Sequence, residues 1–276
     1  MIRPISGKNK AMQEAADLRP GTERAGDRIT GRKRTVLSTG FILALIVLWQ
    51  LISMLIGKSF ILPSPIAVLE SLWENRVEIF TVHFPATLKV VVYGGVLSVV
   101  LGAAFAVLMD WNELIERALY PILTLTQTIP VMCIAPAFVL WFGYTVKMRV
   151  IVVILVNFFT VTVNLYDGFA STNPNRQELL QTYGASRWQI FTLLRMPTAL
   201  PYFFTALKVA VPWSVVGAAV AEWLGAPDGL GTYSRACMMN LDAAGLLAPL
   251  IVLTAFALIL NLILNLIEGV SGGRFF

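Results

Sequence analysis

The sequence predicts an all-α, polytopic membrane protein with about six transmembrane helices. Of its 276 residues, 57% are hydrophobic and only 13% are charged, which is the composition of a membrane-embedded chain. Apolar windows of about 20 residues, the length that crosses the hydrocarbon core of a bilayer, recur along the chain. The expected spans lie near residues 36–56, 87–109, 118–141, 149–168, 203–224 and 246–268.

The chain begins with a basic segment. Residues 1–34 contain nine Lys or Arg against four acidic residues, whereas the remainder holds twelve of each. Because this segment is poor in large apolar groups, we expect it to be a disordered tail that precedes a membrane domain over residues 35–276. Its last basic residues, Arg32, Lys33 and Arg34, lead directly into the first span. The positive-inside rule explains them without a nucleic-acid partner.

Charge asymmetry predicts the orientation of the spans. Six spans place both termini on one side, and if that side is cytoplasmic it carries fourteen basic residues against five in the outer loops. Since cytoplasmic loops are enriched in Lys and Arg, we expect both termini in the cytoplasm. The loop over residues 170–201 then also lies in the cytoplasm.

Individual spans differ in their prolines and small residues. The third span contains Pro121, Pro130 and Pro136, and the fifth contains Pro212. Lipid tolerates the backbone groups that proline frees only where protein or water satisfies them, so these two spans are expected to face the protein interior. The second span carries small residues that suit close helix packing: Gly94, Gly95, Gly102 and Ala106.

The capping residues and apolar spacing of the loop predict two short amphipathic helices. Asn173 and Pro174 form an N-cap with a proline at the first helical position, and Gly184 is placed to end that helix in the left-handed conformation. A second helix is expected to start after Ser186. The apolar residues that share a face are Leu179, Leu180 and Tyr183 on the first helix and Trp188, Phe191 and Leu194 on the second. Such a surface outside the bilayer needs to bury against either a partner or the protein's own helices.

The spacing of this loop resembles the cytoplasmic "EAA" loop of membrane permeases of binding-protein-dependent ABC importers. The matching positions are Glu178, Gly184, Leu194, Arg195, Met196 and Pro197. Leu179 and Leu180 depart from the pattern, since alanines are usual there. In that family the loop forms the coupling helices that insert into a groove on the ATPase subunit.

The resemblance extends from about Phe60 to the C-terminus. Four segments look like the branch that serves sulfonates, taurine, nitrate and thiamine precursors: Phe60-Ile-Leu-Pro-Ser-Pro, Thr128-Ile-Pro-Val, Leu140-Trp-Phe-Gly and Ala221-Glu-Trp-Leu-Gly-Ala-Pro-Asp-Gly-Leu-Gly.

This resemblance implies a type I ABC importer permease fold in a bacterial inner membrane. It also implies a homodimer with one pathway at its two-fold axis, two ATPase subunits that carry ATP and Mg²⁺ below it, and a periplasmic or extracellular solute-binding protein above. Residues 62–65 and 225–231 are then the expected contacts with the binding protein.

A small set of residues inside the spans can line a translocation pathway. Polar groups there are costly in lipid, so they usually face a pathway or a partner helix. The candidates are Gln127, Pro130, Asn157, Asn164, Trp213, Glu222 and Trp223. The amides can instead bond between helices. Glu222 beside Trp223 is either a gate or substrate contact at an outer mouth, or an interfacial carboxylate next to an aromatic-belt residue.

The sequence does not predict an enzyme, a cofactor or a metal site on this chain. Gly57-Lys58-Ser59 resembles the end of a phosphate loop, but Ile52 stands where the first glycine is required. His83 is the only histidine, which disfavours a Ser-His-Asp triad and multi-histidine metal sites. The rival to an importer subunit is a self-sufficient channel or ion-coupled transporter, and the scarcity of intramembrane ionisable groups disfavours it.

The substrate class is the least constrained prediction. Sulfonates, taurine, nitrate and a thiamine-precursor pyrimidine all fit the resemblance. No arginine cluster lines a span, which disfavours an anion held by charge pairing. The Glu222–Trp223 pair suits a flat heterocycle with donor groups better.

Overall fold

The computed structural model describes residues 23–272, and the chain divides into two units at Lys58 and Ser59. Every regular element within this described range is a helix, which confirms the all-α prediction. Residues 1–22 of the expected tail, and Arg274 in the orientation count, lie outside the described residues.

The first unit contains α2 (Glu23–Ile56). The expected tail and first span therefore share one helix from Glu23 onward, where the sequence predicted disorder up to residue 34. The segment has no proline, and lengthening an existing helix avoids the cost of a new nucleus. The stretch apolar enough to cross a membrane is Thr39–Ile56, close to the predicted 36–56.

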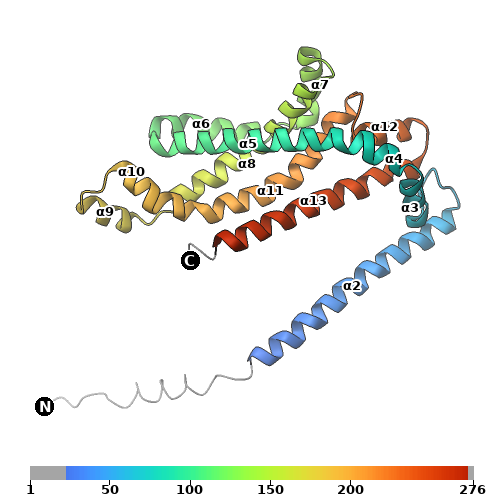
Figure 1. The fold of residues 1–276 in the computed structure, drawn as a ribbon, viewed down its shortest axis with the longest axis horizontal. Coiled ribbons are helices and arrows are strands. Elements are labelled where there is room, and N and C mark those ends of the chain that lie inside the picture. The colour runs from blue at the N-terminus through green and yellow to red at the C-terminus, as the bar shows by residue number, and fades with distance from the viewer. Residues whose placement is uncertain (1–22, 273–276) are drawn as a thin grey trace. The chain divides into compact units, whose positions relative to one another are not determined.

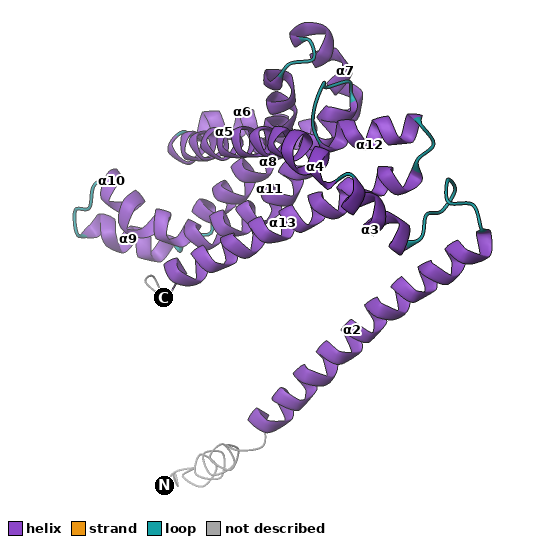
Figure 2. Ribbon diagram, turned by 45° about the vertical axis from the view of Figure 1, so that its right-hand side comes forward, coloured by secondary structure: helices purple, strands orange, loops and turns teal. Residues whose placement is uncertain are grey.

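The second unit is a bundle with short helices at both ends (Figures 1 and 2). Its elements are α3 (Pro65–Glu74), α4 (Arg76–Glu78), the π-helix η1 (Ile79–His83), α5 (Phe84–Trp111), α6 (Glu113–Thr126), α7 (Val131–Phe142), α8 (Val146–Ala170), α9 (Pro174–Thr182), α10 (Arg187–Ile190), the π-helix η2 (Phe191–Arg195), α11 (Met196–Trp223), α12 (Leu230–Met239) and α13 (Ala243–Gly272).

The centre of this unit is the packing of α8 between α5 and α11. A Cβ on Gly94 would lie 2.6 Å from Val153, and one on Gly102 would lie 2.8 Å from Val161. Both distances are too short for a side chain, so the two backbones approach as closely as glycine allows. This confirms the predicted role of the small residues in the second span.

A buried hydrogen bond joins the other pair of central helices. Asn157 Nδ2 of α8 donates to Ser214 Oγ of α11 at 2.7 Å, and both residues are almost fully buried. A polar pair of this kind fixes the register of two helices whose remaining contacts are apolar.

Five described helices are long and apolar enough to cross a membrane, and a sixth crossing results if α6 and α7 count as one broken span. These two helices meet at an angle of 98°. Pro130 accounts for the break, because it occupies the N-cap of α7 in an extended conformation and cannot continue the ladder of α6.

The broken span is largely exposed within this chain. Pro121, Pro130 and Pro136 are exposed, and only Leu123 of α6 and Ala135 of α7 are buried. The expectation that this span faces the interior is therefore wrong for the isolated protomer. By contrast α11, which carries Pro212, packs on α5, α8, α12 and α13 as expected.

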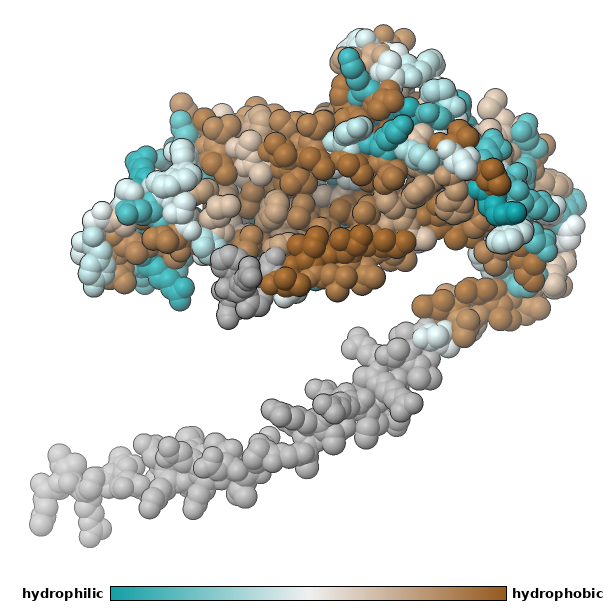
Figure 3. Space-filling model, viewed as in Figure 1, coloured by the Kyte–Doolittle hydropathy of each residue, from teal (hydrophilic) through white to brown (hydrophobic). Residues whose placement is uncertain are grey.

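The surface of the second unit is apolar along the bundle and polar at its two ends (Figure 3). One end carries α9 and α10, and we call it the loop end. The other carries α3, α12 and residues 225–231, and we call it the turn end. The helices between these two ends have the apolar surface that contact with a bilayer requires.

Candidate functional site

The loop end is built by local sequence signals that act as predicted. Asn173 caps α9 by accepting from the Asn175 N–H at 2.9 Å, and Pro174 is the first helical residue. Gly184 has a φ of 79°, which confirms the left-handed position. The Ala185 N–H donates to the Leu180 carbonyl at 3.0 Å and the Gly184 N–H to the Gln181 carbonyl at 2.9 Å. This pair of bonds is a Schellman motif, which ends α9 cleanly.

The second loop helix begins at a capping box. Ser186 Oγ accepts from the Gln189 N–H, and Gln189 Oε1 accepts from the Ser186 N–H. After one turn of α10 the chain continues as η2 and then α11. The second loop helix is therefore continuous with the fifth predicted span.

An aromatic group fixes this helix to the bundle. Phe191 is buried, with its ring centroid 5.9 Å from that of Trp111 at the end of α5 and 5.5 Å from that of Phe169 at the end of α8. Trp188 meets Trp111 edge-on at 6.0 Å. The group attaches the loop to two other membrane helices.

The apolar face predicted for the loop divides between the two roles that the sequence left open. Phe191 packs on the protein's own helices, whereas Leu179, Tyr183 and Trp188 project outward with 55%, 81% and 60% of their surface exposed. Leu180, Leu194 and Pro197 are partly buried, and Glu178 is exposed. A row of exposed large side chains at a polar end of the bundle is a surface suited to a partner.

Arg195, at the end of η2, joins three elements of the loop end. It forms an ion pair with Asp110 of α5, and its Nη2 donates to Gln177 Oε1 of α9 at 3.1 Å. The Asp110 side chain is only 5% exposed. Beside these residues lies a cleft of about 520 Å³, lined by Asp110, Trp111, Glu113, Gln177, Gln181, Arg187, Trp188, Ile190, Phe191 and Arg195.

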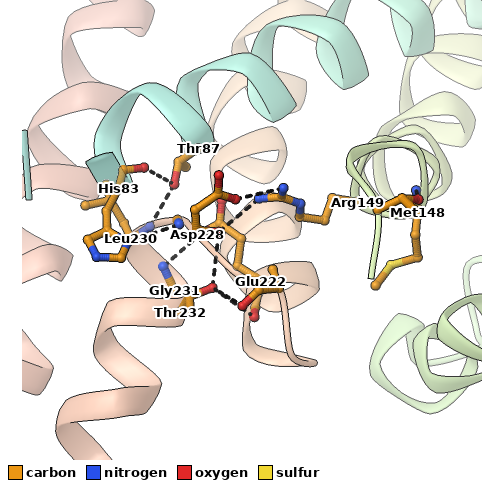
Figure 4. Close-up of polar contacts among 12 residues, drawn as sticks. His83, Thr87, Met148, Arg149, Glu222, Asp228, Leu230, Gly231 and Thr232 are labelled. Carbon is orange, nitrogen blue, oxygen red and sulfur yellow. Dashed lines mark hydrogen bonds and ion pairs between the residues drawn. The ribbon is translucent and has the colours of Figure 1, made fainter. Parts of the chain in front are cut away.

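The turn end contains a buried polar network around residues 225–231 (Figure 4). Glu222, at the end of α11, is completely buried, and its Oε2 accepts from the Gly231 N–H at 2.8 Å. Gly229 has a φ of 126°, and a Cβ there would lie 2.2 Å from the Glu222 carboxyl carbon. The carboxylate therefore occupies the space that a side chain at position 229 would need.

Side chains from the first turns of two other helices hold the same turn. Arg149 of α8, itself buried, pairs with the Asp228 carboxylate at 2.9 Å and donates to the Asp228 carbonyl at 2.9 Å. Thr87 of α5 accepts from the Leu230 N–H at 2.9 Å. His83 Nδ1 accepts from the Gly229 N–H at 3.2 Å. The turn is thus fixed to α5, α8 and α11 together.

The predicted pathway residues separate into buried and exposed groups. Glu222 and Asn157 are buried inside one chain and bonded there, so their placement favours the structural alternative for both. Asn164 and Trp223 are partly buried, and Asn164 Nδ2 donates to the Thr160 carbonyl of its own helix. Gln127 and Pro130, at the break between α6 and α7, are exposed, as is Trp213 on α11. The structure does not bring all seven residues together.

Sequence reasoning missed the residues that hold the two ends. In the sequence, Asp110 and Trp111 only mark the end of an apolar run that predicts a span, and Arg149 is only one of the five basic residues of the outer loops. A signal existed for Asp110, because an acidic residue that closes a transmembrane run needs a partner. Identifying Arg195 as that partner requires the fold, since the two lie 85 positions apart.

The chain is similar in sequence to known membrane transport proteins. Residues 98–275 match the family model described as "Binding-protein-dependent transport system inner membrane component". The chain is 46% identical to the formylaminopyrimidine transport permease protein ThiX of Halalkalibacterium halodurans over 221 residues, which is 80% of this chain and 88% of that protein. It is 26% identical to the taurine transport system permease protein TauC of Escherichia coli over 253 residues, 86% of this chain and 88% of that one.

A solved structure shares the fold. The crystal structure of an amino acid ABC transporter with histidines matches with a TM-score of 0.58, covering 73% of this chain and 96% of its own. At 15% identity this likeness concerns the fold alone.

The close contact between Gly229 and the Glu222 carboxylate leads to a prediction about stability. Gly229→Ala should lower the midpoint temperature of unfolding in detergent more than Gly143→Ala does. Both glycines have positive φ in a region that L-residues avoid, with φ of 126° and 65°, but a Cβ at Gly143 meets nothing within 4 Å. The collision with Glu222 should add about 1–3 kcal/mol to the loss of stability. Equal losses in the two variants would show that Glu222 does not fill this space.

Proposed function

The chain belongs to the family of binding-protein-dependent transport system inner membrane components, and from this premise we propose that two copies form an import pathway for a small pyrimidine nutrient. The chain is the membrane-spanning permease subunit of an ABC importer.

A pathway between two copies is favoured over one inside a single chain. The contacts at Gly94 and Gly102 leave no room for even a methyl group between α5 and α8. In contrast, α11 presents an exposed stripe at helical spacing: Tyr202, Thr205, Val209, Trp213 and Val216. The break between α6 and α7 leaves Gln127 exposed as well. A second copy is the occupant that completes these faces, and Gln127, Pro130 and Trp213 are the retained pathway candidates.

Each end of the bundle receives a different partner in this proposal. The exposed Leu179, Tyr183 and Trp188 dock on an ATPase subunit, one per copy, which binds ATP and Mg²⁺. The fixed turn over residues 225–231 faces the solute-binding protein, because a rigid surface loses little entropy on binding. The loop end is then cytoplasmic and the N-terminus lies on the same side of the bacterial inner membrane.

Sequence identity to known permeases favours a pyrimidine over a sulfonate as the transported substrate. Identity is 46% to the formylaminopyrimidine permease and 26% to the taurine permease, over similar shares of the chain. The Glu222–Trp223 pair no longer supports this choice, since Glu222 is engaged in the turn. The exposed indole of Trp213 remains a surface on which a flat ring can stack.

Reconstitution tests the function directly. We expect the chain, its cognate ATPase and its binding protein in proteoliposomes to accumulate labelled formylaminopyrimidine in the presence of ATP, and to leave taurine outside. Omitting the ATPase should abolish uptake. Uptake by the chain alone would identify a self-sufficient transporter and contradict the proposal.

Orientation is tested by labelling in intact cells. A cysteine replacing Ser171 at the loop end should resist a membrane-impermeant maleimide, whereas one replacing Pro227 at the turn end should react. Both positions are exposed, and Cys133, which is exposed too, is first replaced by serine. Permeabilised cells, in which both should react, provide the control. The reverse pattern would place the loop end outside and exclude ATPase docking there.

Gly184→Val tests the docking surface. Valine at a φ of 79° is strained by more than about 1 kcal/mol, and because nothing lies within 4 Å of a Cβ there, the effect should stay within the loop. If docking requires this geometry, the affinity for the ATPase should fall by roughly tenfold for each 1.4 kcal/mol of strain, and less ATPase should co-purify. Insertion and yield should not change.

Gly143→Val is the matched control, since it places the same side chain at a positive φ at the turn end. Normal ATPase binding by the Gly184→Val variant would show that the loop is not part of the docking surface.

A further inference from the structure

The loop over residues 170–201 has two routes to the membrane helices. One is the continuous chain from α10 through η2 into α11. The other runs sideways to α5, through the contacts of Trp111 with Trp188 and Phe191 and through the ion pair of Arg195 with Asp110. The first route is covalent, whereas the second depends on side chains and can be altered without breaking a helix.

The cleft beside these residues makes the sideways route important. About 520 Å³ of open space separates parts of α9 and α10 from the junction of α5 and α6, so the loop is not packed against α5 along its length. A loop pushed by a partner can then shift relative to the end of α5, unless specific contacts tie the two. Coupling of this kind travels only through groups that are in physical contact.

Arg195 is placed to make that tie. One guanidinium nitrogen pairs with Asp110 of α5 and the other bonds Gln177 of α9, so the side chain connects α5 to both halves of the loop across the Gly184 turn. The fork of an arginine allows two such bonds in a fixed geometry. The near-complete burial of the Asp110 side chain means that its charge has little water to compensate for a lost partner.

Resting on the proposed function, we infer that Arg195 is a positioning residue for energy coupling, which through Asp110 holds the loop to the end of α5, so that the ATPase displaces the packed core of α5, α8 and α11 and not the loop alone. Arg195 does not touch the substrate, and it does not belong to the exposed docking row. Loss of the pair should therefore separate ATP hydrolysis from transport and leave ATPase binding intact.

The test uses the full reconstituted complex of permease, ATPase and binding protein. Because a single neutral substitution leaves one charge without its partner, the main variant removes both charges, Asp110→Asn with Arg195→Gln. We expect its ATPase co-purification and basal ATP hydrolysis to match the wild type. The substrate transported per ATP hydrolysed, with loaded binding protein present, should fall by at least about fivefold.

Two further variants separate this role from packing. Asp110→Glu keeps the charge and should retain coupling. Arg117→Ala breaks the exposed pair of Arg117 with Glu113, 2.6 Å apart at the same end of the bundle, and should behave as wild type because that pair lies within α6.

Wild-type coupling by the doubly neutral variant would overturn the inference and leave the proposed function standing. A parallel loss of ATPase binding would also overturn it, by showing that the pair only shapes the docking surface. Equal loss in Asp110→Glu and in the doubly neutral variant would assign the effect to packing and overturn the role of charge. A wild-type complex that does not couple ATP to uptake would contradict the proposed function itself.

Discussion

The close approach of α5 and α8 is the contact on which the rest of the second unit depends. Glycines at positions 94 and 102 let Val153 and Val161 lie where any side chain would collide. Helices in lipid gain little from hydrophobic burial, so dispersion contacts at short range supply much of their association. With α8 held against α5, its other face is free to bond α11 through Asn157 and Ser214. The three helices therefore form one packed core.

Both ends of this core are closed by polar and charged side chains that connect different helices. At the turn end, Arg149 of α8 holds Asp228, and Glu222 of α11 bonds Gly231. At the loop end, Arg195 holds Asp110 of α5. A buried ionised side chain is costly unless a partner of opposite charge lies close to it, as Asp228 does for Arg149 and Arg195 does for Asp110. They therefore constrain the relative positions of the helices that they join.

Local signals in the sequence were sufficient for some features and not for others. The cap at Asn173, the left-handed Gly184 and the small-residue packing at Gly102 depend on neighbours in sequence or on helical spacing, and each was predictable. The roles of Glu222 and Asn157 depend on partners in other elements, Gly231 and Ser214, which no local pattern identifies. The exposure of the proline-bearing third span was also missed, because the argument from unsatisfied backbone groups does not say which molecule covers them.

The distribution of restraints indicates where motion is possible. Helix α11 is bonded at mid-length to α8, at its end to the turn, and through Arg195 to α5, so these helices are expected to move as one body. By contrast, α6 and α7 are separated by a 98° break and contribute few buried residues. A packed core that resists internal rearrangement changes its access by rotating against a neighbour, as rigid units do in other switching proteins. The opening and closing of a pathway is therefore expected between copies, with the broken span at the moving boundary.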